Sequence, residues 1–428
     1  MSLLIVKLGA RGGRIAVIVV GLLLIAGAWL SLKWNFANML ASRLEADKPE
    51  ARIVADWLST TSPSDPRTHS AAGAAFERSF DIGDVDRALN EYETTASLSP
   101  NDYFAWLNVG RLRGLSGDRD GMISALDRAL QLAPYYAAVQ WAYGNALIRQ
   151  GRLDDGFAYL AKAAEGNPEY ARPAALTALQ MLDGDIGAAR RALGSSEATT
   201  AALVDALSLL KRFDEAVDLW SAIPAERRST TFAKLGSAVR EQLTAAKRFR
   251  LAARVAADLW PVEDGPTAGH ITNAGFESDV RLRGAGVFEW QIADGTQPMI
   301  GIAEGQALEG QKNLFLLFNS FESSAFRSVA QTVAVEPGRE YKLTLHYRSD
   351  VKSAASLKFE AANACELTVI GSSEPMAPSA DWATLGMRIT VPANCDGIVI
   401  RLNREGCSGP TCLTTGKLSL DSFSLTQF

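Results

Sequence analysis

Four cysteines give the clearest chemical signal in this sequence. Cys365, Cys395, Cys407 and Cys412 all lie in the last quarter of the chain. An even number of cysteines in one region indicates disulfide bonds and an oxidising compartment. The short loop from Cys407 to Cys412 can close on itself, which would leave Cys365 with Cys395, although three pairings are possible. Zinc is the alternative, but the spacing lacks C-x-x-C and no histidine lies near these cysteines.

Catalytic chemistry has no comparable signal. The three histidines, His69, His270 and His346, lie in three different segments. The sequence contains no serine-hydrolase, zinc-protease, phosphate-binding or dinucleotide-binding motif. We therefore expect a protein that is not an enzyme. A pair of carboxylates for glycoside cleavage is the alternative, and it would make the protein a polysaccharide-modifying enzyme.

The composition limits the class of protein. The chain has 428 residues, of which 47% are hydrophobic, enough for two or three domains with packed cores. Its formal net charge is -5. A protein that neutralises phosphates needs a basic face, which this balance does not indicate, so we expect no nucleic-acid partner.

An apolar run from Ile15 to Leu32 follows the basic residues Lys7, Arg11 and Arg14. About 18 apolar residues are enough to cross a bilayer, and the basic flank favours the cytoplasmic side. We therefore predict a cytoplasmic stub and single-pass anchor over residues 1–33, in a bacterial inner membrane, with the bulk of the chain in the periplasm. A cleaved signal peptide ending at Ala26-Gly27-Ala28 is the alternative, and it places the same residues outside the cytoplasm.

A 34-residue period begins after a helical linker predicted over residues 34–68. The period is kept by glycines, prolines and large apolar residues, at Gly83, Gly117 and Gly151, at Pro100, Pro134 and Pro168, and at Tyr92, Leu126 and Leu160. Helix pairs stacked on one another explain such a period. We predict three helix pairs over residues 69–170 and degenerate capping repeats over residues 171–260.

The middle unit resembles the tetratricopeptide repeat (TPR) family, through Trp106, Val109, Gly110, Gly117, Met122, Leu126, Ala129 and Pro134. Arg113, at an aromatic position, and Phe76, at a small one, depart from that pattern. The resemblance implies an all-α solenoid that docks a protein partner on its concave face.

Inward positions on successive first helices are again 34 residues apart. The pairs are Leu107 with Trp141, Arg111 with Asn145, and Leu115 with Arg149, so that apolar and basic groups line one concave face. Such a face suits a peptide or an acidic segment of a partner protein. The alternative is that Trp141 packs on its neighbours and the arginines are merely solvated.

The helical period ends at a linker over residues 261–268, which contains Pro261, Gly265 and Pro266. Beyond it, segments such as 341–348 and 398–403 alternate with period two. Short alternating strands between glycine and proline turns predict an antiparallel β-sandwich over residues 269–428.

This region resembles the jelly-roll carbohydrate-binding modules of the galactose-binding-like group. The resemblance is carried in order by segment 273–277, Trp290, Gln331, segment 337–341, Trp382 and segment 416–421. It implies a structural calcium ion held by the residues Gly275, Glu277, Glu309, Lys312 and Asp421, where Gly275 and Lys312 would supply backbone carbonyls. Solvated strand-end acids are the alternative interpretation of Glu277 and Asp421.

The resemblance also implies sugar contacts. Outward strand positions offer four candidates, His346, Arg348, Arg401 and Asn403. Trp290 and Trp382 could stack sugars, but in this family such positions more often belong to the core. Together these interpretations predict a membrane-anchored periplasmic adaptor that docks a protein on its repeats and binds glycan with its sandwich, in envelope polysaccharide or exopolysaccharide assembly or export. The alternative is a structural scaffold whose sandwich binds no sugar.

Overall fold

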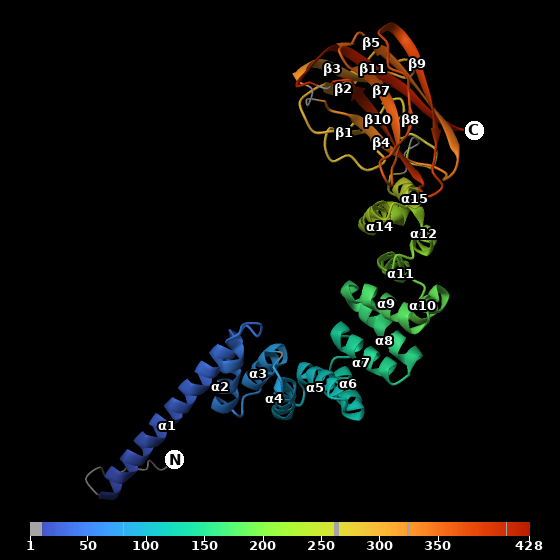
Figure 1. The fold of residues 1–428 in the computed structure, drawn as a ribbon. Helices are drawn as coiled ribbons and strands as arrows, with labels where there is room; N and C mark the ends of the chain where they lie inside the picture. Colours follow the sequence, from blue (N-terminus) through green and yellow to red (C-terminus); the bar gives the residue numbers. More distant parts are fainter. Residues whose placement is uncertain (1–10, 80, 261–264, 323–325, 408) are drawn as a thin grey trace. The chain divides into compact units, whose positions relative to one another are not determined.

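The computed structural model describes residues 11–79, 81–260, 265–322, 326–407 and 409–428. The chain forms two compact units, one ending at Ser195 and the other beginning at Ser196. Figure 1 shows helices in the first unit, and helices followed by two β-sheets in the second. The predicted combination of an apolar N-terminal helix, an all-α repeat region and an antiparallel β-sandwich is confirmed.

The N-terminal helix α1 (Arg11–Ser42) contains the predicted span and continues beyond it. Between Gly13 and Ser42 it is long and apolar enough to cross a membrane, and its most apolar stretch is not buried against the rest of the chain. Such a helix is compatible with a single-pass anchor. Lys7, part of the predicted cytoplasmic stub, lies outside the described residues. The predicted linker therefore comprises the end of α1, helix α2 (Ala51–Thr61) and the start of α3.

Three helix pairs follow the 34-residue period. They are α3 (Pro66–Ser79) with α4 (Asp84–Leu98), α5 (Tyr103–Leu115) with α6 (Arg119–Leu132), and α7 (Ala137–Arg149) with α8 (Leu153–Gly166). Gly83, Gly117 and Gly151 turn the chain within each pair at φ values of 84°, 86° and 80°, a conformation that side chains other than glycine rarely adopt. Pro100, Pro134 and Pro168 follow the second helices, which a proline ring cannot continue.

Gly144 shows why a small residue recurs on the first helix. A Cβ atom at Gly144 would lie 2.9 Å from the carbonyl oxygen of Gly156 on α8. The two helices therefore contact each other through their backbones, and no larger side chain fits between them. The spacing of small residues in the sequence is a direct consequence of this contact.

Shorter helices follow in both units. A 3-10 turn at Pro168–Tyr170, α9 (Ala171–Met181) and α10 (Ile186–Leu193) complete the first unit. The second unit begins with the helices α11 (Glu197–Leu209), α12 (Phe213–Ser221), α13 (Ala225–Ser229), α14 (Ala233–Ala245) and α15 (Phe249–Leu259), and α15 contacts strand β4 of its sandwich. The sequence-based linker at 261–268 lies inside this second unit, and its residues 261–264 are outside the described part of the chain.

The sandwich consists of two sheets with antiparallel pairing. One sheet has the order β1 (Gln291–Ile292), β4 (Val329–Ala334), β10 (Gly397–Glu405), β7 (Ser356–Asn363) and β8 (Val369–Ser372). The other has the order β2 (Met299–Glu304), β3 (Lys312–Glu322), β11 (Thr411–Gln427), β5 (Glu340–Ser349) and β9 (Ser379–Thr390), with β6 (Lys352–Ser353) beside β11. Some neighbouring strands are consecutive in the chain, as β2 and β3 are, and others are far apart in sequence, as β4 and β10 are.

Aromatic rings fill one end of the sandwich core. The Trp290 ring lies 5.2 Å from the ring of Phe276 and 4.9 Å from that of Phe423, and Trp290 is 2% exposed. Its indole N–H donates to the carbonyl of Asn273 at 3.0 Å, so the buried polar atom is satisfied. Trp290 is therefore a core residue and does not present its ring to a sugar.

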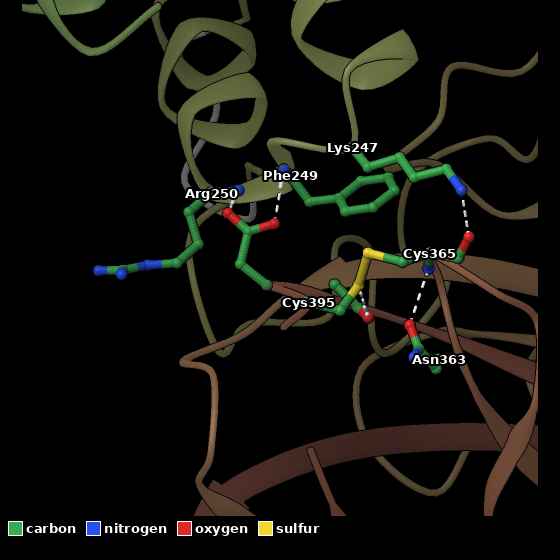
Figure 2. Close-up of a disulfide and its surroundings, with 8 residues drawn as sticks. Lys247, Phe249, Arg250, Asn363, Cys365 and Cys395 are labelled. Atoms are coloured by element: carbon green, nitrogen blue, oxygen red, sulfur yellow. Dashed lines mark hydrogen bonds between the residues drawn. A yellow bond between two sulfur atoms is a disulfide. The ribbon is translucent and has the colours of Figure 1, made fainter. Parts of the chain in front are cut away.

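Helix α15 is held against the sandwich by the loop that carries Cys395, as Figure 2 shows. The carboxylate of Asp396 accepts hydrogen bonds from the backbone N–H groups of Phe249, at 2.9 Å, and Arg250, at 3.1 Å. These are orphan donors at the start of the helix, and a negative charge there is favourable. The Arg250 guanidinium also pairs with Glu336 at 2.6 Å.

The disulfide between Cys365 and Cys395 lies directly beside this contact (Figure 2). The Lys247 ammonium donates to the carbonyl of Cys365 from the turn before α15. The Phe249 ring occupies the space where a side chain at Gly397 would lie. The second disulfide joins Cys407 to Cys412. Of the three possible pairings, the structure therefore contains the one that joins Cys365 to Cys395 and Cys407 to Cys412.

Candidate functional site

A groove on the solenoid brings together most of the predicted docking residues. Helices α5, α6 and α7 enclose about 340 Å³, and Arg111, Leu115, Trp141, Asn145 and Arg149 all line this space. We call it the solenoid groove. Leu107 does not line it, because its side chain is 6% exposed and packs in the core with Leu126 and Val139. Five residues chosen from a 34-residue spacing thus share one concave surface.

The two arginines give the solenoid groove a positive character. The Arg111 guanidinium donates to Asn108 and to Glu77, each at 2.7 Å. Its pair with Glu77 is half solvated, so it contributes little to stability and leaves Arg111 available to a ligand. Arg149 is exposed and forms no ion pair with any described residue. The groove therefore offers one unpaired cation and one weakly paired cation.

Apolar surface lies beside these charges. The Trp141 ring stacks on Tyr170 at a centroid distance of 5.1 Å, which fixes its orientation in the groove. Leu115 is 67% exposed at the other side. Asn145 donates to the carbonyl of Trp141 at 2.8 Å. The arrangement is suited to an extended segment that carries both apolar and acidic side chains.

In the sandwich, the five residues predicted to bind calcium gather around the loop at residues 305–311. The Asp421 carboxylate accepts from the backbone N–H of Leu308 at 2.7 Å. The Glu277 carboxylate accepts from Gln311 and Lys312 at 2.9 and 3.0 Å. A Cβ at Gly275 would lie 3.8 Å from Asp421, and Glu309 accepts a bond from Ser422 at 3.3 Å. The resemblance therefore selected residues that are neighbours in space.

The electrostatics of the two carboxylates differ. The backbone N–H groups of Lys312 and Gln311 lower the pKa of Glu277, which lies at the surface. Burial raises the pKa of Asp421, which is 0% exposed, although N–H groups of Leu308 and Ser422 oppose that shift. Within the described ranges, no three acidic, histidine or cysteine side chains converge as a metal-binding group. A calcium ion held by these carboxylates and by backbone carbonyls, the oxygen ligands that calcium prefers, therefore stays a prediction.

Calcium binding at this loop is a prediction that a titration checks. Adding calcium to chelator-treated protein should raise the thermal midpoint of the sandwich, because an ion that binds only the folded state stabilises it, by about 2.7 kcal/mol at 100 times its Kd. The increment should vanish in Glu277→Gln, with Glu304→Gln as the matched control on β2. An unchanged midpoint in the wild type would show that the backbone N–H groups alone satisfy these acids.

The four residues predicted to contact sugar lie on opposite outer faces of the sandwich. His346 and Arg348 alternate with buried residues of β5, in the sheet centred on β11. Arg401 and Asn403 alternate with buried residues of β10, in the other sheet. Since the two sheets pack through their inner faces, these four side chains do not form one site.

Arg401 and Asn403 on β10 donate hydrogen bonds to a buried acid, Glu360. Asn403 donates to the Glu360 carboxylate at 2.8 Å and Arg401 at 3.2 Å, while Lys358 lies 3.5 Å away. Glu360 is 5% exposed. Burial opposes its ionisation, but the bonds from Asn403 and Arg401 outweigh that effect and lower its pKa. The polar groups of this cluster are hydrogen-bonded to one another, so few of them are available to a ligand.

Arg348, which shares the outer face of β5 with His346, lies near an aromatic ring, that of Trp382, and not beside a buried acid. The Arg348 guanidinium lies 5.5 Å from the centre of the Trp382 ring and donates to Gln306 at 2.7 Å. Trp382 is half-buried and is not part of the sandwich core, so the expectation that it packs inside is not met. On β9 the buried residues are Leu385, Met387 and Ile389. This alternation was the signal that Trp382 faces outward.

No family model matches this chain, and no curated protein matches it. A solved structure of MamA from Desulfovibrio magneticus RS-1 is similar at 20% identity over 38% of this chain and 89% of that chain, with a TM-score of 0.31. A CBM4 structure is similar at 12% identity over 37% of this chain and 99% of that chain, with a TM-score of 0.28. TmCBM61, solved in complex with β-1,4-galactotriose, is similar at 13% identity over 38% of this chain and 100% of that chain, with a TM-score of 0.28.

Proposed function

We propose that this protein is a non-enzymatic, membrane-anchored adaptor that docks an acidic, partly apolar segment of a partner protein in the solenoid groove and binds glycan with its sandwich. The observation that carries the proposal is the solenoid groove itself, where Trp141 and Leu115 lie beside the unpaired Arg149. Helix pairs present such surfaces to extended ligands. The chain is acidic overall, which argues against nucleic acid as the partner.

Glycan binding is supported by the outer surface of β5 and β9. Trp382 offers an aromatic ring, while Arg348 and His346 offer polar groups on the same side of the sheet. Aromatic rings with a few polar side chains recognise sugars because a sugar ring has an apolar face and polar edges.

Two features support the location that we propose for this protein. Helix α1 is long and apolar enough to anchor the chain, and two disulfides favour an oxidising compartment. A periplasmic site on a bacterial inner membrane combines both. An adaptor there that binds protein and glycan would serve the assembly or export of envelope polysaccharide or exopolysaccharide.

Charge reversal in the solenoid groove tests the docking half. Full-length protein in detergent micelles is used to select from a random short-peptide display library, and the enriched peptides should combine Asp or Glu with large apolar residues. Arg149→Glu should weaken these peptides by roughly tenfold, because an exposed ion pair contributes up to about 1 kcal/mol and reversal adds repulsion. Fluorescence anisotropy gives the affinities.

Arg119→Glu is the matched control, since Arg119 is exposed on α6 of the preceding helix pair but does not line the solenoid groove. Equal weakening by both variants would mean that only net charge matters, and the groove proposal would then fail. Enrichment of peptides without acidic residues would have the same consequence.

Two alternatives differ in what they bind or turn over. A structural scaffold would dock its protein partner and leave every glycan unbound. A polysaccharide-modifying enzyme would show turnover that is lost when one acid outside the set Glu277, Glu309 and Asp421 is changed. The self-satisfied position of Glu360 gives no support to the enzyme alternative.

A further inference from the structure

The second unit contains a partly open cavity that lies apart from the outer faces of both sheets. It has a volume of about 360 Å³ and lies where α14 and α15 meet the segment at residues 272–290 of the sandwich. We call it the junction cavity. Its size falls within the range of small-molecule sites, which are concave and mainly apolar with a few convergent polar groups.

The position of the helices that form this cavity is fixed by specific contacts. Asp396 holds the start of α15 through two backbone N–H groups, and Arg250 pairs with Glu336. The cavity wall formed by α15 is therefore held by contacts that include the two backbone hydrogen bonds that Figure 2 shows beside the disulfide. A site assembled in this way is rigid before a ligand arrives, which reduces the entropy lost on binding.

An aromatic ring forms the apolar floor. Trp260, at the end of α15, is 39% exposed, so part of its ring is accessible from the cavity. The Arg240 guanidinium lies 5.2 Å from the centre of this ring and its side chain is 15% exposed. Its nearest acid is Glu241, which is 73% exposed and 3.6 Å away, a weak pair.

Charged groups of both signs converge on the remaining wall. Arg281 pairs with Glu289 at 3.2 Å, and the Glu289 carboxylate also accepts from the backbone N–H of Gly286 at 2.9 Å. Asp279 lines the cavity as well. Two arginines and two acids give the lining no net charge, and they offer paired donors and acceptors beside an apolar ring.

This balance identifies the class of ligand. An acyl chain would remove water from these charged groups and offer them no hydrogen bonds in return, which is costly. An anion would meet as many acids as arginines. A neutral sugar satisfies both kinds of group, because its hydroxyls donate and accept while its ring face packs on an indole. We infer that the junction cavity binds the terminal neutral sugar of a glycan chain, an inference that rests on the glycan-binding half of the proposed function.

Ligand-observed NMR with full-length protein in detergent micelles tests this inference. The probes are free glucose, galactose, mannose and N-acetylglucosamine. We expect saturation transfer to at least one of them, and binding about tenfold weaker or absent in Trp260→Ala. Val287→Trp should also abolish it, because a larger side chain at this half-buried lining position fills the cavity without removing a polar group.

Trp382→Ala is the control, since it removes the ring on the outer face of β9 and leaves the junction cavity intact. Loss of binding in Trp382→Ala, with Trp260→Ala and Val287→Trp binding like the wild type, would overturn the inference and leave glycan binding in place on the sheet. Silence toward all four sugars would also overturn it, while binding of longer glycans by the same preparation would keep the proposed function.

Discussion

Replacing Cys365 and Cys395 together by serine is expected to destabilise the second unit by about 3 to 4 kcal/mol. The crosslink joins residues 30 apart, and the loss of loop-closure entropy in the unfolded chain accounts for an effect of this size. Cys395 is 3% exposed and precedes Asp396, so the variant should also loosen the contact with α15. Thermal and denaturant unfolding, followed by tryptophan fluorescence, measures the change.

The matched control is the double serine variant of Cys407 and Cys412. These residues are only 5 apart, so the same entropy argument gives a smaller effect of about 2 kcal/mol. If both double variants lower the free energy of unfolding by the same amount, the effect of the Cys365–Cys395 disulfide does not come from the greater length of the loop that it closes. Hydrogen exchange at the Phe249 and Arg250 amides would show whether that contact opens first.

Trp290→Ala is expected to cost about 3 to 5 kcal/mol, the usual range for removing a large aromatic side chain from a core. The ring contacts Phe276 and Phe423, and its N–H donates a hydrogen bond to the carbonyl of Asn273, so truncation leaves a cavity and removes a hydrogen bond. The midpoint of denaturant unfolding gives the loss of free energy.

Trp382→Ala provides the comparison, because this half-buried ring lies outside the core cluster. Its loss should change the free energy of unfolding by less than about 1 kcal/mol, as for most surface substitutions. Equal destabilisation by the two variants would contradict the assignment of Trp290 to the core and Trp382 to the surface.

The helical half was predictable because each feature is local. A 34-residue period fixes the turn glycines, the close approach at Gly144 and the proline after each pair, so the helix pairs follow from the sequence alone. Positions 34 apart recur on the same surface, and this placed Leu115 and Arg149 in one groove. Leu107 failed the same rule, because at its position in the helix the side chain packs between the helices of the solenoid.

The sequence predicts that the C-terminal region is a β-sandwich, but it does not predict the order of the strands in each sheet. Period-two alternation shows which side chains of a strand share a face, and it grouped His346 with Arg348. It does not tell which strands are neighbours, so Arg401 and Asn403 were assigned to the same site although β10 belongs to the other sheet. The link between Asp396 and α15 spans 147 residues and leaves no local pattern.

The measurement that tests the adaptor most directly is glycan binding by the full-length protein on an array of neutral and acidic bacterial polysaccharide fragments. The account predicts binding to at least one fragment class, retained when Arg149 is changed to Glu, since the solenoid groove and the sandwich are separate sites. Silence across the whole array would contradict the adaptor and favour a scaffold that contacts proteins alone.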